Sequence, residues 1–163
     1  MDKIQLLDAL ADFTKNEVAD LILPTCPQKG EEQVFRAAEV HKMRLPDMSK
    51  STKKAPWIIH QIVTGKDEQK PGEMPLSTVL VRSIFCVYDE NESEGAMNLL
   101  NLVERVRIGL LRIPFLADQF TLLRTPPIEI MLYPEDNAPF FIGEMATTWR
   151  VPSIEKEVSQ WLR

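Results

Sequence analysis

The chain has few of the residues that usually build catalytic, redox or metal sites. Its 163 residues include two histidines, His41 and His60, and two cysteines, Cys26 and Cys86. The cysteines stand far apart with no Cys-x-x-Cys motif, so we expect reduced thiols. Neither histidine has carboxylates or thiols at the spacing of a metal site, and both are interpreted as structural. We expect no catalytic residue, no metal and no cofactor.

Positive charge and long apolar runs are also scarce. The 19 Lys and Arg residues against 24 Asp and Glu give a net charge of −5, whereas a nucleic-acid-binding surface needs clustered basic residues. No segment approaches the roughly 20 consecutive apolar residues of a membrane span. Residues 1–17 carry acidic side chains within their apolar part, unlike a signal peptide. We expect a cytoplasmic protein without a membrane or sequence-specific nucleic-acid partner.

The clearest pattern is a long β-hairpin in the centre of the chain, at 57–88. Alternating apolar residues predict strands over 57–64 and 77–89, joined by the polar stretch 65–75. Both strands are apolar on both faces, which is typical of central strands covered on each side by helices or by a neighbouring subunit. The 65–75 connection exceeds the two to five residues of most hairpin loops. We interpret it as a functional loop or as one that orders on assembly.

The rest of the chain completes an α+β pattern. Periodicity predicts helices near 2–23, 95–113 and 153–163, and further strands near 121–133 and 144–151. Residues 28–56 are irregular, with one or two short strands and an exposed loop, and are interpreted as an arm. This order predicts one domain over 1–163, with a mainly antiparallel mixed sheet flanked by helices.

Three local patterns could indicate chemistry. The acidic run 89–94 could bind a divalent cation, but it lacks the glycine turn of a calcium loop, and acidic residues with an N-cap at Ser93 are typical of a helix start. A nucleophilic pair of Cys86 with His60 is disfavoured because Cys86 stands mid-strand among apolar residues. Arg105 and Arg112 lie seven residues apart on one helix face. They form either a solvated flank or a subunit contact.

Four segments carry a more specific signal. They are EVHKMRLPDMS (39–49), PWIIHQIVTGKD (56–67), VRSIFCVYDENESEGAMNLLNLVERVRIGLLR (81–112) and YPEDNAPFFIGEMATTWRVPSIEKEV (133–158). In order and spacing they resemble structural proteins of tailed phages and prophages of Gram-positive bacteria. The most similar group is the tail terminator, or tail-completion, family. None of the four segments is a catalytic signature.

This resemblance implies a fold, a function and partners. Family members have a small mixed sheet flanked by helices and form a homo-oligomeric ring, commonly a hexamer. The ring caps the tail tube, ends its polymerisation and joins it to the head–tail connector. The expected location is the host cytoplasm during assembly and then the head-proximal end of the tail in the virion. The residues expected at the tail-tube or subunit interface are Lys66, Asp67, Glu68, Gln69, Lys70, Arg105 and Arg112.

Two alternatives stay open at this point. A head-completion or neck protein of the head–tail interface would share the phage setting but not the capping role. A small cytoplasmic enzyme would assemble its site from the acidic run 89–94 and the Arg105–Arg112 face. Electron microscopy of a knockout separates the first from a terminator, and a tightly bound metal or nucleotide would favour the second.

Overall fold

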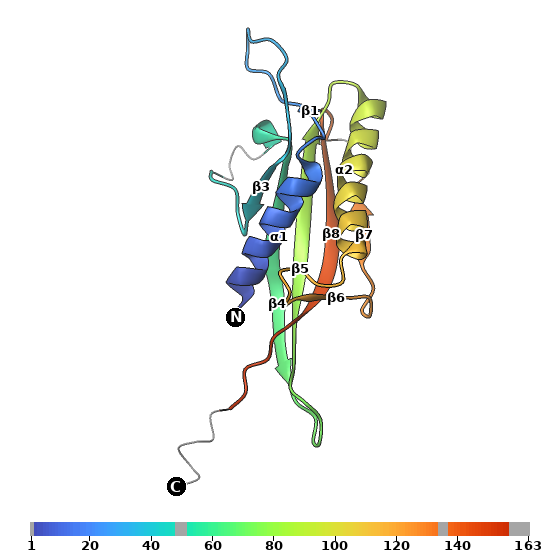
Figure 1. Cartoon of the computed structure of the whole chain (residues 1–163). Helices are drawn as coiled ribbons and strands as arrows, with labels where there is room; N and C mark the ends of the chain where they lie inside the picture. The colour runs from blue at the N-terminus through green and yellow to red at the C-terminus, as the bar shows by residue number, and fades with distance from the viewer. Residues whose placement is uncertain (1, 48–51, 134–136, 157–163) are drawn as a thin grey trace.

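Two long antiparallel strands form the centre of the molecule (Figure 1). The computed structural model describes residues 2–47, 52–133 and 137–156. Its elements, in chain order, are α1 (Lys3–Val18), β1 (Leu23–Pro24), β2 (Phe35–Arg36), β3 (Glu39–Lys42), the 3-10 helix η2 (Thr52–Lys54), β4 (Trp57–Glu68), β5 (Leu76–Tyr88), α2 (Glu92–Arg112), β6 (Thr121–Leu123), β7 (Glu129–Leu132) and β8 (Phe140–Val151).

The main sheet has six strands and is mixed. Its order is β3-β4-β5-β8, and both β6 and β7 pair with the outer edge of β8. All of these pairings are antiparallel except β3 with β4, which is parallel. The predicted fold class, α+β with a mainly antiparallel mixed sheet, is confirmed.

Local sequence explains where both helices begin. α1 starts with a capping box, in which the Asp2 carboxylate accepts from the Gln5 backbone and the Gln5 side chain accepts from the Asp2 backbone. α2 starts at Asn91, whose side chain accepts from the Glu94 backbone at 3.1 Å. The predicted N-cap, Ser93, is therefore wrong. It lies in the first turn, because Asn91 caps equally well and comes two residues earlier.

The main core lies between the sheet and the two helices. α1 and α2 pack side by side on one sheet face and bury their apolar stripes there (Figure 1). The largest fully buried side chains of this layer include Leu6, Leu10, Leu102, Phe85 and Trp149.

The other sheet face is covered over only part of its length. A second cluster buries Leu45 and Ala55 of the arm against Trp57, Cys86 and Tyr88. Further along the same face, Val63 is 48% exposed and Met131 is 58% exposed. Apolar residues on both strand faces thus predicted a cover on each side. Within the described residues, only one face has a complete cover.

Four boundaries differ from the predicted ones. β4 continues to Glu68, so the connection spans 69–75 instead of 65–75. α1 ends at Val18, where the chain turns and the Leu21 backbone donates to the Val18 carbonyl, and Leu23 already belongs to β1. β8 begins at Phe140, before the predicted residue 144. The helix predicted near 153–163 is absent over 153–156, and its remaining residues lie outside the described part of the chain.

The arm at 28–56 contains the short strands that its alternation predicted. β2 pairs with β1 to form a two-stranded ribbon, and the loop between them, 25–34, projects from the end of the molecule opposite the β4–β5 tip (Figure 1). Neither described helix combines the length and apolar character needed to cross a lipid bilayer.

Candidate interaction surface on the hairpin

The β4–β5 hairpin extends beyond the helices and ends in a free tip (Figure 1). Every residue from 63 to 74 is exposed. The tip is nevertheless ordered by its own hydrogen bonds: the Glu73 backbone donates to the Lys70 carbonyl, and the Gln69 amide donates to the Glu73 carbonyl. Gly72 has a φ of +78°, a left-handed turn conformation that favours glycine. The hairpin is thus a preformed projection.

Hydroxyl and carboxylate groups fix the stem of the hairpin. Ser77, which pairs with Asp67 across the two strands, donates to the Asp67 carboxylate at 2.6 Å. Ser153, just after β8, lies 3.0 Å from the Ser77 hydroxyl and 3.3 Å from the Pro75 carbonyl. These contacts join the hairpin to the end of β8, so the position of the tip is set by the main sheet.

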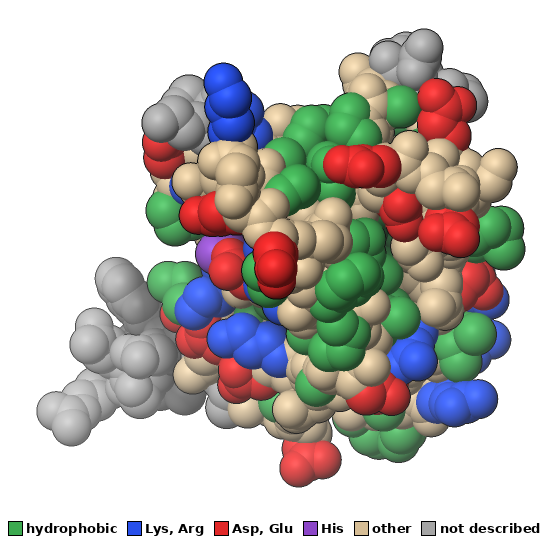
Figure 2. Space-filling view, turned by 90° about the horizontal axis from the view of Figure 1, so that it is seen from above, with side chains coloured by type: hydrophobic (Ala, Val, Ile, Leu, Met, Phe, Trp, Pro, Cys, Tyr) green, Lys and Arg blue, Asp and Glu red, His purple; other side chains and the backbone are tan. Residues whose placement is uncertain are grey.

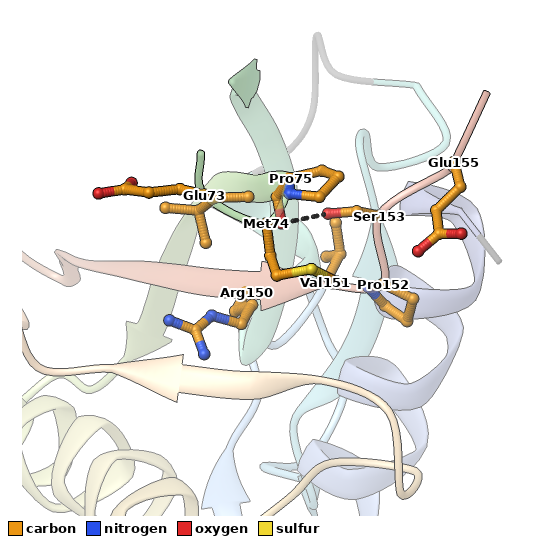
Figure 3. A pocket seen from close by; sticks show the side chains of 9 residues that line it. Glu73, Met74, Pro75, Arg150, Val151, Pro152, Ser153 and Glu155 are labelled. Atoms are coloured by element: carbon orange, nitrogen blue, oxygen red, sulfur yellow. Dashed lines mark hydrogen bonds between the residues drawn. The ribbon is translucent and has the colours of Figure 1, made fainter. Parts of the chain in front are cut away.

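A groove of about 540 Å³ lies where the hairpin meets the end of β8 (Figure 3). Met74, Leu76 and Val151 give it apolar surface. Figure 3 shows the carboxylates of Glu73 and Glu155 at opposite ends of the groove, so they do not converge on one point. Two carboxylates that act together as general acid and general base must both reach the reacting atoms of one substrate. The two carboxylates therefore do not form an acid–base pair in this groove.

The structure separates the seven predicted interface residues. Lys66, Asp67 and Glu68 lie in β4, not in the loop, and Gln69 and Lys70 begin the tip. Asp67 is engaged by Ser77. The other four present exposed side chains, two of them positively charged and one negatively charged.

The two arginines lie elsewhere and differ from each other. Arg105 binds Asp20, just after α1, at 2.5 Å and so ties the two helices together. Arg112, at the last turn of α2, is exposed, and no ion pair reaches it within the described residues. The ion pair is solvent-exposed, so it agrees with a solvated flank for Arg105, and both the solvated-flank and the subunit-contact hypotheses stay open for Arg112.

His60 occupies a buried polar bridge. Its Nε2 lies 2.8 Å from the Thr14 hydroxyl of α1, and its Nδ1 lies 2.7 Å from the Ser83 hydroxyl of β5. Burial lowers the pKa of His60 to about 4, so the ring is neutral at pH 7. Reasoning from the sequence missed this pairing, although Thr14 is a polar residue on the buried stripe of α1.

The hypothetical Cys86–His60 pair does not form. Cys86 aligns with Trp57, whereas His60 aligns with Ser83, and the odd separation of Cys86 from Ser83 places the two side chains on opposite sheet faces. Burial also raises the pKa of Cys86 to about 12, which keeps the thiol protonated.

The acidic run organises the start of α2. The Asp89 carboxylate accepts from the Asn91 backbone and from the Asn98 side chain, and Glu90 accepts from the Tyr88 hydroxyl. Within the described ranges, no three His, Cys, Asp or Glu side chains are grouped to hold a metal ion. Along α2, Arg105 lies about 17 Å and Arg112 about 27 Å from Glu94. The enzyme site hypothesised from these two features is not brought together.

Among the described residues, the hairpin is the most prominent projecting surface. Comparison with known proteins adds no relative: no protein-family model matches the chain, and no curated protein shows significant sequence similarity to it.

Proposed function

We propose that this chain is a tail terminator of a tailed phage, a structural protein that caps the tail tube, ends its polymerisation and joins it to the head connector. The chain would act without making or breaking a bond. The observation that carries the proposal is the projecting β4–β5 hairpin, together with the sequence resemblance described above.

A preformed hairpin is suited to capping a repeating structure. Its backbone is already paired from Trp57 to Glu68 and joined to β8, so binding orders few additional residues and loses little conformational entropy. The tip would occupy the site on the last tube ring where the next tube subunit would otherwise add.

The tip and the β4 residues next to it carry charges of both signs. Lys66 and Lys70 stand beside Glu68 and Glu73, and all four side chains are exposed. Exposed charges at the rim of an interface contribute more to orientation and association rate than to affinity. They would set the register of the cap on the tube.

The opposite end of the molecule offers a second surface. Ile22, Val34 and Phe35, at the base of the arm ribbon, are each more than half exposed. Figure 2, which views this end, shows hydrophobic side chains running across it with acidic side chains beside them. A protein that joins two partners needs two surfaces that face apart, and we assign this end to the head connector.

The remaining parts of the proposal concern assembly. The cap would be a homo-oligomeric ring, a hexamer in the virion, formed in the host cytoplasm and retained at the head-proximal end of the tail. The net charge of −5 would repel DNA passing through the lumen, which suits a conduit.

The test is to shorten the hairpin tip without cutting into the sheet. Removing residues 66–72 would delete β4 residues that pair with Leu76–Thr78, so we replace 69–75 with Asn-Gly, which closes a two-residue hairpin at the Glu68–Leu76 pair. In the phage that encodes the chain, we expect overlong and irregular tails by electron microscopy and an unchanged midpoint of thermal unfolding. Tails of normal length would overturn the proposed role.

The arm end supports a second candidate, a head-completion or neck protein that docks mainly through Ile22, Val34 and Phe35. A knockout distinguishes the two. Overlong tails indicate a terminator, and free tails of normal length beside filled heads indicate a neck protein.

A further inference from the structure

α2 has two apolar stripes on opposite sides. The first includes Leu99, Leu102, Val103, Val106 and Leu110, and is buried against the sheet. The second stripe is formed by Met97, Leu100 and Ile108, which are 64%, 37% and 36% exposed. At 100° per residue, the second stripe lies on the side of the helix directly away from the first. A helix that contacts only its own sheet is normally polar on that outer side.

The sheet has a matching deficit on its far face. Beyond the arm, Val63, Leu80, Met131 and Ala146 line an uncovered groove of about 380 Å³. A sheet with an apolar face is stable when a second layer covers that face, and a helix is one of the common covers. Within the described residues, no helix packs there.

The charges of the two surfaces are complementary. Glu129 and Glu144 border the groove, and no ion pair reaches either carboxylate within the described residues. Arg82 also lines the groove and donates to the neutral Gln61 side chain at 2.8 Å, so its charge remains and the groove has a net charge of −1. On the outer stripe of α2, Glu104 is bound by Arg107, which leaves the exposed Arg112 as the free charge at the C-terminal end of the stripe, while the exposed Glu94 lies at its N-terminal end.

We infer that the outer stripe of α2 in one copy of the chain docks on the uncovered sheet groove of the next copy, with Arg112 facing Glu129 and Glu144. This inference deepens the ring part of the proposed function and rests on it for the closed ring. The two surfaces lie on opposite sides of the sheet, so the contact is head-to-tail and repeats from copy to copy. It would give α2 a sheet on both sides.

The test uses two variants of the full chain, each blocked on one surface. The helix-face variant carries Met97→Asp and Ile108→Asp, and the sheet-face variant carries Val63→Asp and Met131→Asp. All four positions are at least 36% exposed, so both variants should fold. Phe35→Asp, at a position 58% exposed on the arm, is the matched control.

Sedimentation velocity over a concentration series up to about 1 mM detects weak association. We expect the average mass of the original chain and of Phe35→Asp to rise with concentration, and each blocked variant to stay monomeric. An equimolar mixture of the blocked variants retains one competent helix face and one competent sheet face, so it should form dimers and nothing larger.

Three results would overturn the inference: a monomeric original chain up to that limit, blocked variants that associate like the original, or a mixture that stays monomeric. None of these measurements involves the hairpin tip. If association fails while the shortened hairpin still gives overlong tails, only the docking contact is lost and the capping role stands.

Discussion

The Nε2 atom of His60 lies 2.8 Å from the Oγ1 atom of Thr14, in a buried contact that joins helix α1 to strand β4. The other ring nitrogen lies 2.7 Å from the Ser83 hydroxyl. A neutral imidazole has one N–H donor and one acceptor nitrogen, so two hydroxyl partners satisfy it completely. Both hydroxyls could also accept from a protonated ring, so it is burial, which lowers the pKa of His60 to about 4, that keeps the bridge in its neutral form at pH 7.

The first prediction concerns stability at mildly acidic pH. Burial lowers the pKa of His60 from 6.5 to about 4, so between these values the unfolded chain binds more protons than the folded one. The stability that depends on neutral His60 is complete above pH 6.5 and declines as the pH falls toward 4. The total loss is about 3 kcal/mol at 1.36 kcal/mol per pKa unit. Urea unfolding from pH 7.5 to pH 4 measures it.

The matched control is His60→Gln, which keeps a donor and an acceptor but does not titrate. Protonation of carboxylates also lowers the free energy of unfolding in acid. The informative quantity is therefore the difference between the two proteins in how steeply this free energy falls with pH. Equal slopes between pH 6.5 and pH 4 would show that His60 does not carry the effect.

The second prediction concerns the partner of this bond. Thr14→Val keeps the shape of the side chain and removes the hydroxyl, which leaves one nitrogen of His60 buried without a partner. We expect a loss of about 1–3 kcal/mol in the free energy of unfolding, the usual cost of an unsatisfied buried polar group. Thr14→Ser, which retains the hydroxyl, should lose less. A Val variant as stable as the Ser variant would contradict this role of the hydroxyl.

This bridge also marks the limit of what the sequence could predict. The alternation of WIIHQIVT and of VLVRSIFCVY was enough to place both central strands, because each has an apolar face packed in the core. The extension of β4 through Gly65–Glu68 was not predictable from alternation. Those residues are polar and exposed, and are held in the strand by pairing with Leu76–Val79.

Contacts between distant segments were harder still to predict. Thr14 and His60 are 46 residues apart, and the parallel pairing of Glu39–Lys42 with Trp57–His60 depends on how the arm folds back. The second stripe of α2 was available in the sequence, since Met97, Leu100 and Ile108 have helical spacing. Its significance depends on knowing which side of the helix the sheet covers.

The third prediction tests the packing of α2 on β8. Gly95 is buried in the first turn of α2, and a Cβ atom there would overlap the ring of Phe141. In an exposed helix, Gly→Ala is stabilising by roughly 0.5–1 kcal/mol. Here we expect Gly95→Ala to destabilise the protein by about 1–3 kcal/mol, the typical cost of overpacking. Thermal or urea unfolding measures the change.

A second substitution tests the cause. If the ring of Phe141 is the obstacle, adding Phe141→Leu to Gly95→Ala should cost less than the sum of the two single changes. A strictly additive pair, or a stabilised Gly95→Ala protein, would mean that the helix start moves away from β8 at little cost.

The last prediction tests whether the two ends of the molecule have different roles in phage tail assembly. Phe35 is 58% exposed at the base of the arm, at the end opposite the hairpin tip. If this end meets the head connector, Phe35→Asp places a charge in an apolar contact and weakens that joint alone. We expect tails of normal length, an increased fraction of free tails, and filled heads without tails by electron microscopy.

The shortened hairpin should give the reverse pattern, with overlong tails. Overlong tails from Phe35→Asp would instead place the tube contact at the arm, because a charge so far from the tip cannot disturb a hairpin that is joined to β8 through Ser77 and Ser153.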